Sequence, residues 1–503
     1  MFCIYPFYME QGYIDLGKAK FHFFLIYSLG AGAILAILWL AYFLVDLYRK
    51  YRQKQTYLID WSRISSTDLF VLMYATVIFL SYVYTDYRQE ALWGAEGWYI
   101  GLVLWLMLCG LYFLISRLWR GNVFVWYIAI IASGVVFLLG ILDRFSLYLV
   151  PIEVRQPEFV STIGNINWFC GYLSVLSPIS ISLFIFQEGG NSGINSKRKW
   201  LCAVFSAIAF MAGFSQGSSS IFLFWIALFV ILLWISVQRR QWLADWFLMI
   251  ALCSFSAQLV RLMRFLLPGN YNYDTDTLCG ALTDSNLTIF AGAGALIILF
   301  LIKGKQFEID SKTGIVVHRI MMGILAAVLL IWGILSLVNT IVGIPQLAEN
   351  SSFLWNRQWG NGRGMTLWAG FEAFKSMSLN QKLLGIGPDC FAAYTYSLPE
   401  IAAELRAYFG SSRLTNAHNE LMTSMVNIGI VGTLLYLGIF ISFILRCFKR
   451  GKERPFLYIA AVCVFCYLIH NMVSFAQVLN LPFAFLVMAM GESLMRDKYN
   501  APG

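Results

Sequence analysis

FFLIYSLGAGAILAILWLAYFLV, residues 23–45, has no charged side chain and is long enough for a helix to cross a lipid bilayer. A basic flank follows it directly, with Arg49, Lys50, Arg52 and Lys54. An apolar run that ends in positive charges is typical of a membrane segment whose end stays on the cytoplasmic side. The stretch therefore predicts a transmembrane α-helix.

The composition of the whole chain agrees with this interpretation. Of its 503 residues, 59% are hydrophobic and only 13% are charged, with a mean hydropathy of +0.69. Soluble domains carry roughly 25% charged residues. Apolar runs of about 20 residues favour helices over barrel strands, because barrel strands are shorter and alternate in polarity. We therefore predict an all-α, polytopic integral membrane protein.

Thirteen apolar runs qualify as transmembrane helices, within a range of 12 to 14. They lie at roughly 22–46, 66–84, 97–116, 123–142, 166–186, 200–214, 219–237, 243–260, 286–302, 319–342, 421–445, 456–474 and 478–495. With the N-terminus outside, the inner segments hold 23 of the 36 Lys and Arg residues. The excess of positive charge on one side predicts an N-out, C-in orientation.

The net charge of +9 is explained by this asymmetry, and no loop contains a long Lys/Arg block. We therefore expect the lipid bilayer, and no nucleic acid, among the partners.

Three regions follow from this map. Residues 1–342 form an N-terminal bundle of about ten helices, residues 343–419 form a large external loop, and residues 420–503 form a three-helix transmembrane segment. Loops of this length are usually functional.

Within the predicted external loop 343–419, an apolar stripe at helical spacing predicts an amphipathic helix on the membrane face, and a second helix is predicted to follow Ser397 and to end near Gly410. The stripe consists of Leu367, Trp368, Phe371 and Phe374.

Two stretches of the external loop carry candidate functional groups. In NGRGMTLW (361–368), Arg363 offers a planar set of donors that suits phosphate or carboxylate. The alternative is an arginine that reaches toward lipid headgroups.

The second stretch is RLTNAHNE (413–420), where Thr415 or Asn416 is expected to cap the following helix. His418 would then lie in the first helical turn, where the helix field favours an anion and a neutral imidazole. His418 is thus a candidate general base, and the alternative is an interfacial residue that caps its own helix. Arg413 and Asn419 are candidate substrate contacts in the same stretch.

Other polar groups have weaker claims. Asp274 and Asp276 form a DxD pair of the kind that holds a divalent metal, a common chance pattern. Asn165 and Asn167, in GNINW (164–168), can bind sugar hydroxyls or cap a helix, and the residues alone favour capping. We expect His22, His318 and His470 to be structural.

The cysteines give two expectations. The CxxC of Cys463 and Cys466 is expected to pack within its span. A disulfide between Cys279 and Cys390 is a further hypothesis, because both are placed in external loops.

The order of several motifs resembles the O-antigen ligase and O-antigen polymerase superfamily of bacterial membrane glycosyltransferases. The matching stretches are GNINW (164–168), GRGMTLW (362–368), LLGIGPDCF (383–391) and AHNELMTSMVNIGIVGTLLYLGIF (417–440), followed by two short spans. The resemblance covers the chain from residue 164 onward. It implies a location in the bacterial cytoplasmic (inner) membrane, with the active site facing the periplasm or exterior.

The resemblance implies transfer of a glycan from undecaprenyl pyrophosphate to an acceptor hydroxyl, by an inverting, metal-independent reaction without a cofactor. By position, His418 matches the family's loop histidine, which is thought to activate the acceptor. Arg363 matches the arginine of the family's GRxxxW stretch, and Trp368, which follows it in this chain, is a candidate substrate contact. The implied partners are the lipid-linked donor, a glycan or lipid acceptor, and a flippase or chain-length regulator.

One position departs from the family pattern. Where the family often has an arginine opening a middle span, this chain has Ser218 in FSQGSSSIF (214–222). Arg144, Arg155, Arg261 and Arg264 are the candidates to replace that charge.

Three alternatives remain at the level of sequence. The enzyme can be a polymerase or a ligase. A metal-dependent glycosyltransferase would use Asp274 and Asp276 instead. A transporter of polysaccharide or lipid is disfavoured, because no Lys or Arg falls in the middle of a predicted span and no internal repeat is visible.

Overall fold

The computed structural model of the chain describes residues 1–53, 64–152, 155–187, 193–304, 311–347 and 353–496. Parts of the predicted basic segment 49–63, of the external loop 343–419 and of the C-terminal region 420–503 therefore lie outside the described residues. Helices make up 75% of the structure and strands almost none, which confirms the predicted all-α class.

The described residues of the first half of the chain form a short 3₁₀ helix, nine α-helices and a β-hairpin with two residues in each strand. These are η1 (Tyr5–Phe7), α1 (Leu16–Arg52), α2 (Ser66–Val83), α3 (Arg88–Trp93), α4 (Leu102–Leu118), α5 (Phe124–Arg144), β1 (Phe159–Val160), β2 (Gly164–Asn165), α6 (Ile166–Phe186), α7 (Gly193–Gln216), α8 (Ile221–Ser236) and α9 (Arg240–Leu266). β1 and β2 pair antiparallel, with Phe159 opposite Asn165.

Ten further helices lie among the residues that the structure describes in the second half. These are α10 (Leu278–Asp284), α11 (Leu287–Lys303), α12 (Ser311–Val342), α13 (Trp359–Ser376), α14 (Leu379–Leu384), α15 (Phe391–Ser397), α16 (Pro399–Phe409), α17 (Glu420–Gly451), α18 (Phe456–His470) and α19 (Leu481–Arg496).

Every predicted span coincides with a helix. Among the described residues, eight helices are long and apolar enough to cross a membrane, or nine if the bent pair α10 and α11 is one span. Helices α4, α8 and α18 are apolar but shorter. The chain thus has the character of a multi-pass membrane protein, while the number of thirteen spans and the N-out orientation stay predictions.

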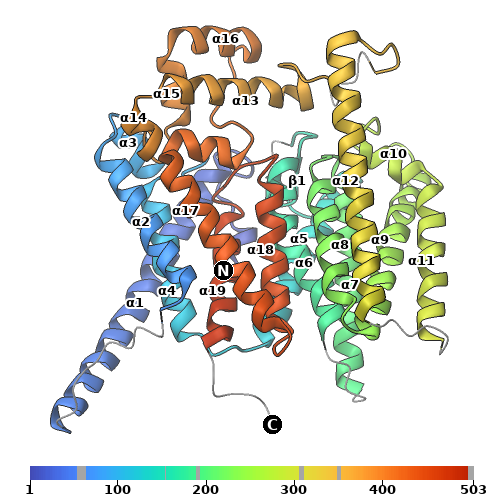
Figure 1. The fold of residues 1–503 in the computed structure, drawn as a ribbon, viewed down its shortest axis with the longest axis horizontal. Helices are drawn as coiled ribbons and strands as arrows, with labels where there is room; N and C mark the ends of the chain where they lie inside the picture. The colour runs from blue at the N-terminus through green and yellow to red at the C-terminus, as the bar shows by residue number, and fades with distance from the viewer. Residues whose placement is uncertain (54–63, 153–154, 188–192, 305–310, 348–352, 497–503) are drawn as a thin grey trace.

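The helices differ sharply in how much of their surface the protein covers. The most apolar 18-residue stretch of α6 is completely buried, and α6 packs against α5, α7 and α18. In contrast, only 6% of the most apolar stretch of α12 is buried, and the lower part of α1 leans away from the bundle (Figure 1). An apolar surface of this extent is suited to contact with lipid tails rather than water.

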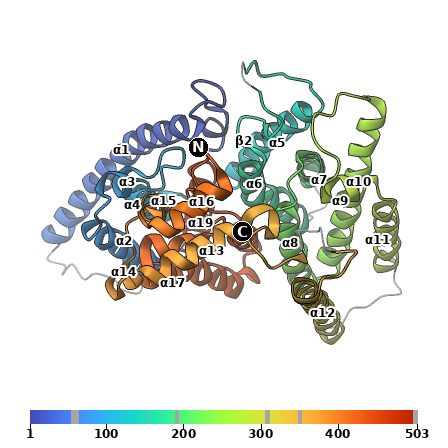
Figure 2. The ribbon, with the colours of Figure 1, turned by 90° about the horizontal axis from the view of Figure 1, so that it is seen from above.

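Helices α13 to α16 form a cap across one end of the bundle (Figure 1), and seen from above α13 crosses over α17 (Figure 2). The cap has a core of its own, to which Met365, Ala369 and Ala373 of α13 and Leu405 of α16 contribute. The predicted stripe of α13 is therefore not its buried face, since Phe371 is 52% exposed. The second predicted loop helix is confirmed as α16, which ends at Gly410.

Helix α17 is broken one-third of the way along. Gly429 has φ +70° and ψ −177°, and a Cβ at this position would lie 2.3 Å from the carbonyl oxygen of Leu383. The break exposes backbone groups of α17 to the segment after α14, where the N–H groups of Ile386 and Gly387 donate to the carbonyls of Val426 and Asn427. This joint anchors the cap to the bundle.

The opposite end of the bundle is held by buried charges. Asp68 at the start of α2 pairs with Arg117 at 3.0 Å and with Arg496, and it accepts a hydrogen bond from Tyr112. Glu492 pairs with the same Arg496 at 3.1 Å. This network joins α2, α4 and α19.

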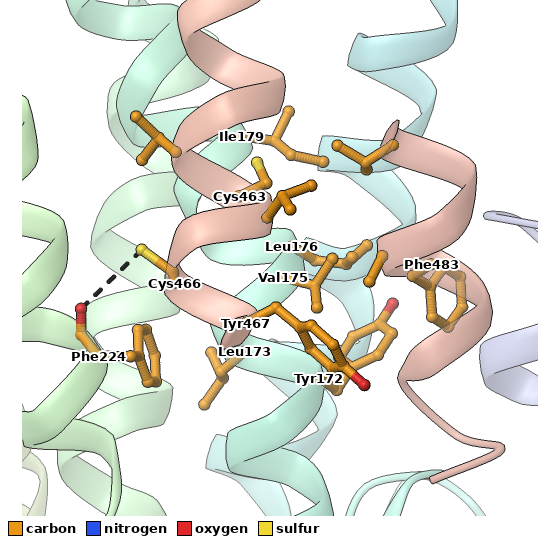
Figure 3. Close-up of a cluster of buried hydrophobic side chains, with 14 of the residues drawn as sticks. Tyr172, Leu173, Val175, Leu176, Ile179, Phe224, Cys463, Cys466, Tyr467 and Phe483 are labelled. Carbon is orange, nitrogen blue, oxygen red and sulfur yellow. Dashed lines mark hydrogen bonds between the residues drawn. The ribbon is translucent and has the colours of Figure 1, made fainter. Parts of the chain in front are cut away.

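The cysteine predictions have opposite outcomes. Cys463 and Cys466 are free and fully buried among the apolar side chains of α6, α8 and α18, as predicted (Figure 3). The predicted disulfide is wrong, because Cys279 and Cys390 are both free. Cys279 lies against the carbonyl of Ser218 and Cys390 against that of Tyr87, so each thiol is enclosed in a different part of the fold.

Candidate active site

A cavity of about 1120 Å³ lies between the cap and the bundle. Its walls come from segments far apart in sequence. These are the start of α6, the turn before α8, the segment around α10, the start of α13 and His418. The polar side chains in its lining are Glu158, Asn165, Asn167, Ser218, Ser219, Ser220, Tyr273, Thr275, Asp276, Thr277, Asp284, Arg363, Thr366 and His418. The cavity thus brings together Asn165, Arg363 and His418, three of the predicted site residues.

Arg363 stands in the first turns of α13 with most of its donors uncommitted. Its Nη1 donates to the carbonyl of Gly360 over 3.5 Å, a weak contact, and its buried Nε has no hydrogen-bond partner. Among the described residues no carboxylate pairs with it. Burial lowers its pKa, so the guanidinium sits in a poorly solvated place where an anion would be bound strongly.

His418 lies one residue before the N-cap of α17, which corrects the predicted position in the first turn. The cap is Asn419, whose Oδ1 accepts from the N–H of Met422. Thr415 and Asn416 are not caps, because Thr415 accepts from the Trp98 indole at 2.6 Å and Asn416 accepts from the N–H of His418 at 3.0 Å. Tertiary partners occupy both side chains.

The backbone and ring of His418 are held in an unusual setting. Its φ is +48°, a left-handed conformation that non-glycine residues adopt infrequently and that concentrates at functional sites. The imidazole packs edge-on against Phe475, with ring centroids 5.5 Å apart, and its buried Nδ1 has no hydrogen-bond partner. His418 therefore lines the cavity as a residue, while its Nδ1 is enclosed by protein without a partner.

The pKa of His418 is lowered to about 4, first by burial and second by the positive charge of Arg363. The imidazole is consequently neutral above that pH and can accept a proton. Because the charge of Arg363 lowers this pKa, the side chains of Arg363 and His418 interact electrostatically in the cavity.

Thr366 links the two residues through the backbone. It lies one turn after Arg363 on α13, it is 2% exposed, and its hydroxyl is 2.8 Å from the carbonyl oxygen of Ala417. The N–H of Ala417 in turn donates to the hydroxyl of Thr423 on α17. Helix α13 and the residue preceding His418 are thereby fixed to each other and to the bundle.

The wall opposite the cap is built from small polar groups. Asn165 caps α6 through its Oδ1, which accepts from the N–H of Asn167 at 2.9 Å, as the sequence favoured. The Oδ1 of Asn167 accepts from the hydroxyl of Ser218 at 2.8 Å. Asn165 therefore combines a capping role with a place in the cavity wall.

Three predicted site residues are not part of this cavity. Arg413 is exposed and faces Glu90 at 3.5 Å, and Trp368 packs under the guanidinium of Arg357 beside a separate groove between α13 and α16. Asn419 uses its Oδ1 as the helix cap and its Nδ2 to hold the carbonyl of Met472.

Of the four arginines considered as replacements for a charge at Ser218, Arg144 lies nearest to that turn. It is fully buried, donates to the carbonyl of Gln216, and stacks with the ring of Tyr273 4.3 Å from its guanidinium carbon. Gly217 makes room for this ring, since a Cβ there would lie 2.3 Å from it. The positive charge of Arg144 thus lies directly behind the cavity wall.

The other three arginines have local partners. Arg155 pairs with Asp143, Arg261 donates to Asn286, and Arg264 pairs with Asp284.

The aspartates of the DxD pair separate in role. Asp276 lines the cavity, whereas the carboxylate of Asp274 accepts from the N–H of Asp276 and shapes the turn. No group of three or more His, Cys, Asp and Glu side chains that could hold a metal ion occurs in the part of the chain that the structure describes.

The sequence interpretation missed two buried carboxyl groups next to the site, Asp389 and Glu420. Burial raises the pKa of Asp389 to about 7. An acidic residue that opens a long apolar run, as Glu420 does, is the signal that could have drawn attention to this region.

No protein-family model matches this chain, and no curated protein resembles it significantly. The residues that line the cavity are therefore the basis for any functional assignment.

Proposed function

We propose that the protein is a membrane glycosyltransferase that moves a glycan from undecaprenyl pyrophosphate to an acceptor hydroxyl outside the bacterial cytoplasmic membrane. The observation that supports this best is the single cavity shared by His418 and Arg363, a neutral imidazole and an uncommitted guanidinium. Both belong to the stretches that resemble the O-antigen ligase and polymerase superfamily.

The chemistry requires two groups. A departing lipid pyrophosphate carries its own negative charge, so the reaction needs a cation near the leaving group rather than an acid that protonates it. Arg363 fills this role with its free donors. The acceptor hydroxyl must lose a proton as it attacks the anomeric carbon, and His418 is the base that takes it.

The wall formed by Asn165, Asn167 and Ser218 would then contact the glycan or the phosphates. Arg144 adds positive potential from behind this wall without touching the ligand. In this proposal Arg144 is a positioning residue, whose charge compensates for the arginine absent at Ser218.

The cavity lies under the cap, which corresponds to the predicted external loop. The proposed active site therefore faces the periplasm or exterior, where lipid-linked glycans are presented after a flippase has moved them. A chain-length regulator is a further expected partner.

Deletion of the gene followed by sizing of surface glycans tests the function. A polymerase predicts loss of long chains with single repeats retained, and a ligase predicts accumulation of lipid-linked polymer. Unchanged surface and lipid-linked glycans would contradict both.

A metal-dependent transferase is the second candidate, because Asp276 lines the same cavity. It predicts that the double variant Asp274→Asn/Asp276→Asn loses transfer while His418→Ala keeps it. The first proposal predicts the reverse.

A further inference from the structure

A second, much smaller cavity lies inside the protein behind the His418 loop. Its volume is about 30 Å³, enough for a water molecule or a small ion, since a water molecule needs about 10–15 Å³ by this measure. Asn416, whose side chain holds the N–H of His418, and Phe475, which packs on the imidazole, are part of its lining. The cavity is thus separate from the proposed active site but adjacent to it.

Two carboxyl groups line this small cavity. Asp389 is 8% exposed, has φ +58°, and accepts from the N–H groups of Ala95 and Ile100 at 2.8 and 3.0 Å. Glu420 is 5% exposed and accepts from the N–H of Ala476 and the hydroxyl of Ser424. For Asp389, burial is the larger effect and raises its pKa, while its backbone N–H donors favour the ionised form.

Neither carboxyl group is paired with a lysine or arginine among the residues that the structure covers. Two ionised carboxylates that share one enclosed space repel each other, and burial of such charges without compensation is strongly unfavourable. A positive charge must therefore enter the cavity, either as a cation or as a proton.

Other oxygen atoms at the cavity favour the cation. Tyr74 is one of the lining residues, and its hydroxyl is fully buried and has no hydrogen-bond partner. The Oδ1 of Asn427, also in the lining, is equally without a donor. An amide oxygen and a hydroxyl that are left unsatisfied beside two carboxylates form the oxygen-rich set that a hard cation binds.

The location also suits an ion. Asn427 precedes the break of α17 at Gly429, and the loop that carries Asp389 packs into this break through the Gly387 to Asn427 hydrogen bond. Interrupted helices in membrane proteins provide such coordinating groups where a regular helix cannot.

We propose that this cavity binds one divalent cation of the calcium type, ligated by Asp389, Glu420, Asn427 and Tyr74. Two carboxylates neutralise its two charges, and the volume admits a dehydrated ion. Magnesium fits less well, because it keeps several of its waters. The ion would join the loop before α15, the start of α17 and the Ala95–Ile100 segment, and so fix the backbone that presents His418. This site is independent of the proposed glycan transfer.

The test uses the purified full-length protein in detergent, stripped with EGTA. Thermal unfolding is then followed in CaCl₂, in MgCl₂ at the same concentration, and in neither. We expect calcium to raise Tm by about 3 °C or more and magnesium to have a clearly smaller effect. Flow dialysis with radioactive calcium should show one site per chain.

Asp389→Asn and Glu420→Gln should lose the calcium response. Glu372→Gln, which makes the same change at a surface carboxylate paired with Lys375, should keep it. Calcium binding by the wild-type protein decides the question if the two variants fail to fold.

Three results would overturn the proposal. The first is a wild-type protein that neither binds calcium nor gains stability from it. The second is a calcium response that both variants retain in full. The third is stabilisation by acidification alone without any calcium effect, which would show that the carboxyl groups share a proton.

Discussion

Replacing Arg363 by glutamine should impair transfer and change the acid–base behaviour of His418 together. The variant removes the uncommitted guanidinium of the cavity and keeps a side chain of similar reach. Loss of one charged donor aimed at a developing negative charge typically costs about 3 kcal/mol, or a 100- to 1000-fold fall in kcat. We expect a loss of this size.

The second effect follows from the pKa of His418. Burial is the larger cause of its lowering to about 4, and the charge of Arg363 is the second. Without that charge the pKa rises but stays below the ordinary value of about 6.5. The neutral imidazole is the active form, so activity falls as pH drops through the pKa, and this acid limb of kcat/KM should shift to higher pH in Arg363→Gln.

The assay is transfer from purified lipid-linked glycan by protein in detergent, measured between pH 4 and 8. Arg363→Lys keeps the charge and should restore the position of the acid limb while recovering only part of the rate. Arg413→Gln is the matched control, because Arg413 lies outside the cavity, and it should behave like the wild type. An Arg363→Gln enzyme with wild-type kcat and an unshifted acid limb would refute the reasoning.

Three further variants test how the site is held. Thr366→Val removes the hydroxyl that fixes Ala417 and should lower kcat about 10- to 100-fold. The control is Thr395→Val, which removes a buried hydroxyl bonded within α15 and should leave kcat unchanged. Equal kcat values for the two variants would contradict the positioning role of Thr366. Gly429→Ala should destabilise the protein by about 2 kcal/mol or more in thermal unfolding, because φ +70° with ψ −177° is open almost only to glycine; an unchanged Tm would argue against the break in α17. Asp68→Asn should cost about 2 kcal/mol by breaking charged hydrogen bonds at the opposite end of the bundle, and a fully stable variant would show that this network contributes little.

The helices of the bundle could be predicted because apolar runs directly report membrane-length helices. All thirteen runs coincide with helices, and α16 begins at Pro399 and ends at Gly410 as its sequence indicated. The start of α17 could not be predicted, because Thr415, Asn416 and Asn419 are equally good caps in isolation. Trp98, more than 300 residues away, takes Thr415 as a partner and leaves the cap to Asn419.

The candidate site was predictable in part for a similar reason. His418 and Arg363 could be selected as polar groups in a long loop that is predicted to be external, and the structure places both in one cavity. Arg413 carries the same charge as Arg363, and only the fold shows that it points to Glu90 instead. The disulfide failed because sequence position gives no information on the distance between two loops.

His418 is proposed to be the base that activates the acceptor, and this role can be tested on its own. The most direct measurement is glycan transfer by His418→Ala and His418→Gln, with purified lipid-linked donor and acceptor and with thermal unfolding as the check on folding. If His418 is the base, both variants should lose transfer at least 100-fold, while Tm stays close to that of the wild type and donor binding is retained. Transfer at the wild-type rate by a folded His418→Ala protein would contradict it.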